Sequence, residues 1–277
     1  MQNIIEVKRS VSQINRRDLT IIITFHLLAI SALFLFSWEN LAAMLIGNWI
    51  VGSLGVGLGY HRLLTHRSFK TPKWLEYVLT ILGTMSIQSE PYKWVTTHRI
   101  HHRYTEMKED PHSPRTGFWW AHIIWIVLGT GQEHDQATFK KYVPDLLNDK
   151  VHSTIAKFFY IPTIISAIIL FAFGGWSMVL WGVFVRVVFG WHSTWLVNSA
   201  AHYWGKRRFD TNDDSTNNWW VALLTFGEGW HNNHHAYPTS ARHGLKWYEF
   251  DLNWLMIQIF KQLGWAQQIH LYKEKSP

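Results

Sequence analysis

The residues best suited to chemistry in this sequence are histidines, and they stand in clusters. Between Thr97 and Arg103, three histidines occupy positions i, i+3 and i+4. On a helix this spacing puts three imidazoles on one face, where they can converge on a point. The same spacing recurs from His231 to His235, and a looser pair is formed by His61 and His66. A core histidine needs only one hydrogen-bond partner, so eight histidines in three clusters indicate a metal site.

A ninth histidine stands four residues after Asn198, on the same face of a predicted helix. Nine ligands are too many for one ion of four to six ligands, so two ions are the economical interpretation. Imidazole suits zinc, copper, iron and nickel, but not calcium or magnesium. The candidate ligands are His61, His66, His98, His101, His102, His202, His231, His234 and His235. Glu228, three residues before His231, is interpreted as orienting a ligand imidazole.

Four apolar runs, at about 19–36, 41–58, 158–173 and 175–197, each approach the roughly 20 residues that span hydrocarbon. Short turns join the first two runs and the last two, which predicts two helical hairpins. Neither turn contains any of the 26 Lys and Arg residues. By the positive-inside rule, both termini and the segment between the hairpins face the cytoplasm. The 18 Trp residues suit membrane interfaces.

The sequence therefore predicts an all-α integral membrane protein with a single domain over residues 1–277. Its four transmembrane helices lie under a cytoplasmic helical cap formed by 61–157 and 198–277. Two apolar segments, 74–87 and 118–125, are too short to cross and are interpreted as interfacial helices. The net charge of +7 flanks the spans, which favours lipid headgroups and an acidic partner over nucleic acid. No cleavable signal peptide is expected.

The position of the histidines favours oxidative lipid chemistry. Metal ions at the cytoplasmic mouth of a membrane bundle would meet an apolar substrate from the bilayer and a reductant from the water. Breaking an unactivated C–H bond needs an oxidant stronger than any side chain. Iron with dioxygen provides one, whereas zinc has no redox chemistry. The sequence contains no cysteine, which excludes thiolate metal sites and iron–sulfur clusters.

The three clusters, His61 to His66, His98 to His102 and His231 to His235, resemble the histidine boxes of the membrane fatty acid desaturases, in particular the Δ9 acyl-lipid and acyl-CoA group. Further resembling segments are Asp110-Pro111-His112, 117–120, 191–202 and 227–230. The resemblance covers roughly residues 50 to 250. It implies a non-haem di-iron centre held by the nine histidines, with Asn198 holding a water near one iron. It also implies a narrow acyl tunnel and the insertion of a cis double bond, at Δ9, with dioxygen and two electrons.

The resemblance also bears on the partners. In the acyl-CoA enzymes, charged residues before the second box help to hold the coenzyme, but Thr96 and Thr97 carry no charge. The substrate is therefore expected to be a lipid-bound acyl chain, as in the cyanobacterial enzymes, rather than an acyl-CoA. The electrons are expected from an external donor, either ferredoxin or a b-type cytochrome, because both are acidic and the cytoplasmic face is basic. In a cyanobacterium the membrane would be the cell or thylakoid membrane.

Two other functions stay open at this point. The same iron pair could serve a lipid hydroxylase or ketolase, and histidine-rich membrane proteins include metal transporters. Transporters, however, hold their ligands near the bilayer midplane. His26 and His192, within apolar runs, could clasp a haem or form hydrogen-bonded packing. Arg186, in the fourth run, is costly in lipid and is expected to touch a headgroup or pair with a carboxylate.

Other residues near the clusters have supporting interpretations. His112 and His243 are expected to support the ligands rather than bind metal. Trp94, one turn before His98, is a candidate wall of the tunnel or an ordinary packing residue. The histidines expected at the surface or the membrane interface are His122, His134, His152 and His270.

Overall fold

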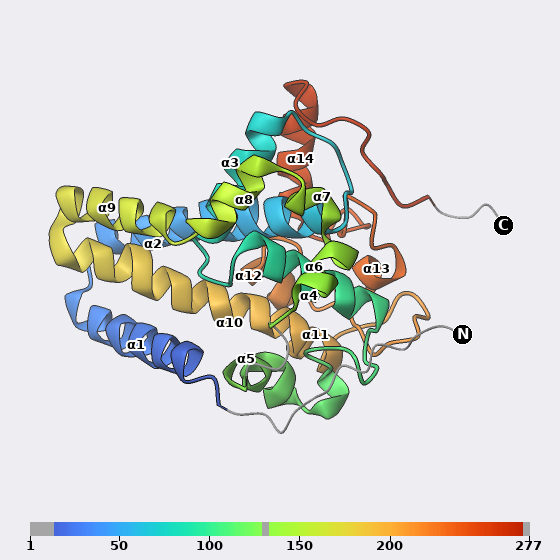
Figure 1. Cartoon of the computed structure of the whole chain (residues 1–277), viewed down its shortest axis with the longest axis horizontal. Helices are drawn as coiled ribbons and strands as arrows, with labels where there is room; N and C mark the ends of the chain where they lie inside the picture. Colours follow the sequence, from blue (N-terminus) through green and yellow to red (C-terminus); the bar gives the residue numbers. More distant parts are fainter. Residues whose placement is uncertain (1–13, 129–132, 274–277) are drawn as a thin grey trace.

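The computed structural model describes residues 14–128 and 133–273, and in these ranges its regular secondary structure is entirely helical (Figure 1). Within them, extended pairing is limited to three isolated bridges. The all-α prediction is confirmed. Most of the expected polar lead-in, residues 1–13, lies outside the described residues.

Three helices in the described ranges are long and apolar enough to cross a membrane. The first consists of α1 (Arg16–Ala32) and η1 (Leu33–Leu35). The second consists of α2 (Trp38–Asn48) and η2 (Trp49–Thr65), and η2 is π-helical, with wider turns than an α-helix. This second helix extends seven residues past the predicted end of the apolar run. It therefore carries His61 inside its last turns, and His66 is its C-cap.

The third long helix, Ile161–Tyr203, contains a reversal. It consists of α9 (Ile161–Val179), η5 (Leu180–Val185), α10 (Arg186–Asn198) and α11 (Ala200–Tyr203). Gly174 and Gly175 have non-helical dihedral angles, and the φ of Gly175, 64°, favours glycine. Leu170, before these glycines, packs against Gly182, after them. The chain therefore turns back at the predicted junction of the third and fourth apolar runs, and α9 and α10 lie antiparallel (Figure 1).

The rest of the described chain consists of shorter helices joined by irregular segments. They are α3 (Lys73–Thr84), α4 (Pro91–Arg103), η3 (Pro114–Thr116), η4 (Trp120–Ile124), α5 (Trp125–Val127), α6 (Gln136–Tyr142), α7 (Pro144–Leu147), α8 (Lys150–Lys157), α12 (Trp219–Leu224), α13 (His231–Ala236) and α14 (Leu252–Gln262). The two segments interpreted as interfacial correspond to α3 and to η4 with α5. Both are too short to span hydrocarbon.

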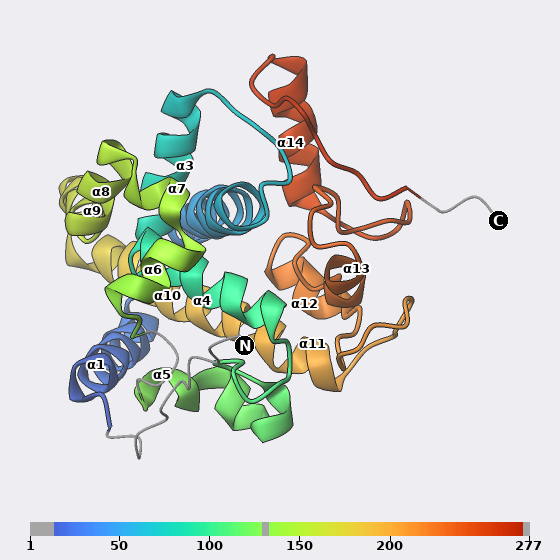
Figure 2. The same cartoon turned by 45° about the vertical axis from the view of Figure 1, so that its right-hand side comes forward.

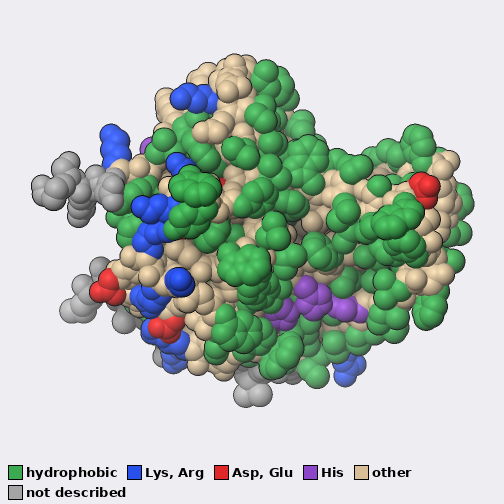
Figure 3. Space-filling model, turned by 180° about the vertical axis from the view of Figure 1, so that it is seen from behind, with side chains coloured by type: hydrophobic (Ala, Val, Ile, Leu, Met, Phe, Trp, Pro, Cys, Tyr) green, Lys and Arg blue, Asp and Glu red, His purple; other side chains and the backbone are tan. Residues whose placement is uncertain are grey.

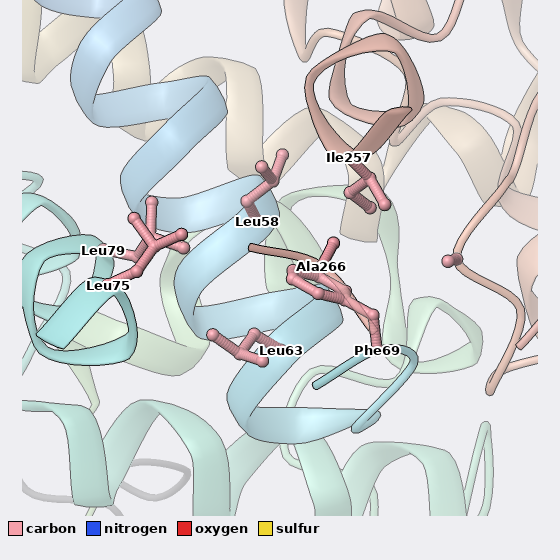
Figure 4. Packing of buried hydrophobic residues seen from close by; sticks show 8 residues of the cluster. Leu58, Leu63, Phe69, Leu75, Leu79, Ile257 and Ala266 are labelled. Carbon is pink, nitrogen blue, oxygen red and sulfur yellow. The ribbon is translucent and has the colours of Figure 1, made fainter. Parts of the chain in front are cut away.

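A hydrophobic core ties the second long helix to two short ones (Figure 4). Leu58 of η2 packs with Leu79 of α3 and Ile257 of α14. Helix α3 lies directly on η2 because Gly55 has no side chain: a Cβ there would be 2.5 Å from the backbone nitrogen of Gly83. The core fixes the end of η2 that carries His61.

The surface is divided by residue type. In Figure 3, hydrophobic side chains cover the long-helix end of the molecule, and most of the visible Lys and Arg side chains lie at the opposite, short-helix end. The side chains of Leu27, Phe34 and Ile168 on the long helices are exposed, Phe34 to 85%. Such a continuous apolar surface suits contact with lipid.

Candidate metal centre

Four elements carry the nine candidate histidines. η2 carries His61 and is followed directly by His66, α4 carries three histidines, α11 carries His202, and α13 carries three more. Figure 2 shows α4, α11 and α13 gathered beside the end of the second long helix. Pro91 at the first turn of α4 provides a fixed φ that suits a helix start. Residues separated by more than 170 positions are thereby brought into contact, as with His61 and His234.

The nine imidazoles form two groups, and within each group the candidate ligand atoms lie within 4.8 Å of one another. The first group is His61, His66, His98, His102 and His234, and the second is His101, His202, His231 and His235. All the predicted candidates are present in these two groups.

Each i, i+3, i+4 cluster is divided between the groups, so the expectation that one cluster converges on one point is wrong. On α4, His98 and His102 belong to the first group and His101 to the second. On α13, His231 and His235 belong to the second group and His234 to the first. Positions i and i+4 are separated by about 40° around a helix, whereas i+3 lies on the other side of i. Each helix therefore presents ligands to both groups.

The imidazoles within a group approach closely through their Nε2 atoms. The Nε2 of His234 lies 3.1 Å from that of His61 and 3.0 Å from that of His102. In the second group, the Nε2 atoms of His202 and His231 are 3.0 Å apart. These atoms point inward to a common centre in each group, as ligands of one ion would.

Carboxylates hold the other ring nitrogen of four of these histidines. The pairs, joined by a hydrogen bond from Nδ1, are His61 with Glu228 at 2.6 Å, His101 with Asp110 at 3.0 Å, His202 with Glu106 at 2.9 Å, and His235 with Asp213 at 2.9 Å. Because Nδ1 donates to a carboxylate, Nε2 carries the lone pair and is free to bind a metal. The four carboxylates therefore fix the tautomer and the orientation of these rings.

The donor set fits a metal ion in each group. The Nε2 atoms of His66 and His235 are buried and have no hydrogen-bond partner within the part of the chain that the structure describes. A buried lone pair without a partner costs free energy, and a bond to a metal would remove that cost. All the ligand atoms are imidazole nitrogens, which suit first-row transition metals.

The protonation state is also suitable. Burial, followed by the neighbouring imidazoles, lowers the pKa of His66, His98, His102, His231 and His234 well below the usual value for histidine. These rings are therefore neutral at pH 7, and a neutral imidazole is the form that binds a metal.

The sequence predicted some of the residues that support the candidate ligand imidazoles. The predicted contact of Glu228 with a ligand imidazole is confirmed, and His243 lies 3.1 Å from the same carboxylate. Glu106 and Asp213 were missed, because they lie in irregular segments with no spacing pattern. Asp110 lay within a resembling segment but was given no role. Of these three carboxylates, Asp110 is the one that the sequence could have indicated, through the resemblance of its segment.

Two of the histidines expected at the surface are buried, and that expectation is wrong for them. His152 contacts Glu76 at 2.8 Å, which a buried imidazole needs. His122 contacts Ser199 and His192, each at 3.0 Å. The Nε2 atoms of His26 and His192 are also 3.0 Å apart. This string of contacts favours hydrogen-bonded packing of the long helices, the second of the two interpretations of these residues.

A cavity of about 380 Å³ reaches the two groups. Its wall includes His98, His231 and Asn198 near the imidazoles, and Trp94, whose ring stacks on that of His98 with centroids 5.1 Å apart. Trp94 thus lines the cavity, as the first interpretation of this residue required. Many of the residues that line the cavity are apolar. An elongated apolar molecule could therefore lie in it beside the imidazoles.

A sequence model of one family, described as fatty acid desaturase, matches residues 36–268. The chain belongs to the fatty acid desaturase family. This desaturase is 50% identical over 240 residues to an sn-1 stearoyl-lipid 9-desaturase of Anabaena variabilis, covering 87% of each chain. It is 47% identical to an sn-2 palmitoyl-lipid 9-desaturase of Nostoc sp. (strain 36), covering 88% of this chain and 86% of the relative. It is 43% identical to an acyl-CoA 5-desaturase of Anemone leveillei, covering 90% and 77%. The desaturase is therefore an oxidoreductase.

Asp213 provides a test of the carboxylate contacts. Replacing Asp213 by asparagine keeps the shape but removes the charge that holds Nδ1 of His235. We expect metal affinity or activity to fall about 10- to 100-fold, which is the usual effect of such a change beside a metal ligand. Metal content after dialysis against a graded chelator measures the effect. The matched control is Asp210→Asn, whose exposed side chain lies near Arg207 instead, and equal losses in the two variants would contradict the assignment.

Proposed function

We propose that this chain is an O2-dependent desaturase that inserts a cis double bond at Δ9 of a lipid-bound saturated acyl chain. The observation that carries the proposal is the pair of histidine groups beside an elongated cavity in a chain of the desaturase family. The carrier and the position are supported by the relatives from Anabaena variabilis and Nostoc, which are both named acyl-lipid 9-desaturases.

We propose that each histidine group holds one iron ion, the first with five imidazoles and the second with four. Asn198 lines the same cavity as His231 and His98, and we propose that its amide holds a water near one iron. When bound, iron with dioxygen supplies an oxidant that can remove hydrogen from an unactivated C–H bond. The protein residues orient the imidazoles, keep them neutral and hold the acyl chain beside them.

We propose that the long helices cross the membrane four times, as two hairpins, with both termini and the histidines on the cytoplasmic side. The reversal at Gly174 and Gly175 supports counting the third long helix as two crossings. The Lys and Arg residues support the orientation, because they are absent from both hairpin turns. On this basis the histidines lie at the membrane surface, where an acidic external donor, ferredoxin or a b-type cytochrome, could deliver electrons.

Lipid analysis of an expressing host tests the function. A bacterial host with saturated membrane lipids, with and without the chain, is compared by mass spectrometry of the intact lipids and by chemical location of double bonds. We expect acyl chains that have lost two hydrogens, with the double bond at the ninth carbon from the carboxyl. A gain of oxygen would reject desaturation in favour of hydroxylation. Stoichiometric zinc without any altered lipid would favour a metal transporter.

A further inference from the structure

The cavity continues beyond the histidines along one face of α10. Arg186, Gly190, Thr194 and Asn198 all line it, at intervals of four residues. Residues at this spacing share a helix face, and the rise of an α-helix puts the two ends of the row about 18 Å apart. The cavity thus extends from the imidazoles, beside Asn198, deep into the bundle of long helices.

The opposite wall is formed by the second long helix, where Asn48, Gly52, Val56 and His61 line the cavity. The two walls end together. A Cβ on Gly47 would lie 2.8 Å from Cδ of Arg186, and a Cβ on Gly190 would lie 3.8 Å from Oδ1 of Asn48. Arg186 and Asn48, at which the two walls end, are both polar and buried. The far end of this channel, which otherwise suits an acyl chain, is therefore not apolar.

Arg186 has no carboxylate partner. Its side chain is 3% exposed, and no carboxylate lies within 4.0 Å of its guanidinium in residues 14–128 and 133–273. Instead, Nε donates to the carbonyl of Gly182 at 2.8 Å, and Nη2 donates to the carbonyl of Met85 at 3.0 Å. The expectation of a carboxylate partner is therefore wrong within the described residues: backbone carbonyls hold this cation. They use two of its five N–H groups.

The cavity is also lined by Asp18, Glu90 and Lys93, which are partly exposed, so we infer that its mouth lies at these residues. Charged residues at this end suit the polar part of a lipid, so the methyl end of the acyl chain points to Arg186. An acyl chain long enough to reach the guanidinium would exclude water and other acceptors from the remaining N–H groups of Arg186. The acyl chain itself accepts no hydrogen bond. Excluding those acceptors costs free energy.

We propose that Arg186, together with Asn48, closes the acyl channel and sets the longest chain that the enzyme accepts. The proposal rests on the proposed desaturase function. Arg186 is on this basis a specificity-determining residue that meets the methyl end of the substrate rather than the reacting carbons. The stearoyl-lipid and palmitoyl-lipid relatives show that chain length is a variable property among similar enzymes.

The test is a competition in which the purified, iron-loaded enzyme meets lipids with myristoyl, palmitoyl, stearoyl and arachidoyl chains in one mixture. For Arg186→Ala, we expect the ratio of the longest to the shortest product to rise about tenfold, since room for two more buried methylenes is worth roughly that factor. For Gly190→Val, which adds a side chain to the channel one turn nearer the histidines, we expect a shift of similar size to shorter chains. A ratio within one sample does not depend on the fraction of folded enzyme.

The outcomes separate the two proposals. Unsaturated products from the unmodified enzyme, with the same length profile in both variants, would overturn the role of Arg186 and leave the desaturase function in place. Failure of the unmodified enzyme to produce any double bond would overturn the function itself. The double bond is expected to stay at the same carbon counted from the carboxyl. If Arg186→Ala does not fold, an unchanged profile in Gly190→Val alone is sufficient to overturn the proposal.

Discussion

Replacing His234 by alanine is expected to abolish desaturation and to lower the iron content of the purified protein. The Nε2 of His234 lies within 3.1 Å of the Nε2 atoms of both His61 and His102, at the centre of the first histidine group. Its removal leaves four imidazoles and opens that group. His98→Ala, in the same group, is expected to have the same effect. Lipid products and bound iron per chain are the two measurements.

Membrane insertion should be unaffected in both variants, because neither histidine lies in one of the three long helices. The matched control is His270→Ala, which removes an exposed imidazole from outside both groups. This control should retain full activity and iron. Desaturation that persists in His234→Ala, with normal insertion, would contradict the assignment of this residue as a ligand.

Replacing Arg62 by methionine is expected to destabilise the fold more than a typical substitution. The side chain of Arg62 is 0% exposed and donates to Glu228, Asp251 and the carbonyl of Ala241. Without the guanidinium, two carboxylates lose their buried cation. Breaking a buried ion pair by removal of one partner costs about 3–5 kcal/mol. Because Glu228 also holds His61, iron should be lost at a lower temperature too.

Thermal unfolding in detergent, followed by tryptophan fluorescence, measures the loss. Arg67→Met is the control, since the side chain of Arg67 is 62% exposed and pairs with Asp145 at the surface. An exposed pair is worth about 0–1 kcal/mol, so the midpoint should change little. Equal midpoints for the two variants would show that the buried network does not contribute as the contacts indicate.

The spacing of the histidines was sufficient to predict that the eight imidazoles of the three clusters come together, but not how they are divided between two groups. The clusters at His98 to His102 and His231 to His235 are visible because metal ligands on a helix require short, fixed intervals. The contacts from Glu106 and Asp213 were not predictable, since both carboxylates lie in irregular segments, 96 and 22 positions away in the sequence from His202 and His235. Long-range pairing of this kind depends on tertiary packing, which no local pattern encodes.

In the fold, too, local sequence patterns predicted some features, whereas tertiary packing determined others. The apolar runs predicted the long helices because lipid contact requires continuous hydrophobic residues, and the turn was placed correctly at Gly174 and Gly175. The run ending at residue 58 gave too short a second helix. Residues from Gly59 to Thr65 are polar or basic at several positions, yet they are buried against α3, α4 and α14 and continue the helix. Packing rather than hydropathy determines where this helix ends.

The division of each helical cluster between two histidine groups has a consequence for assembly. Helices α4 and α13 each present histidines to both groups, so the separation of the two groups is set by rigid helical geometry rather than by loops. An ion that enters one centre clamps the same two helices that build the other. On the proposed assignment, the first ion would order the two helices that the second ion needs, so we expect metal loading to be cooperative. The apoprotein and the fully loaded protein should predominate over the half-loaded one.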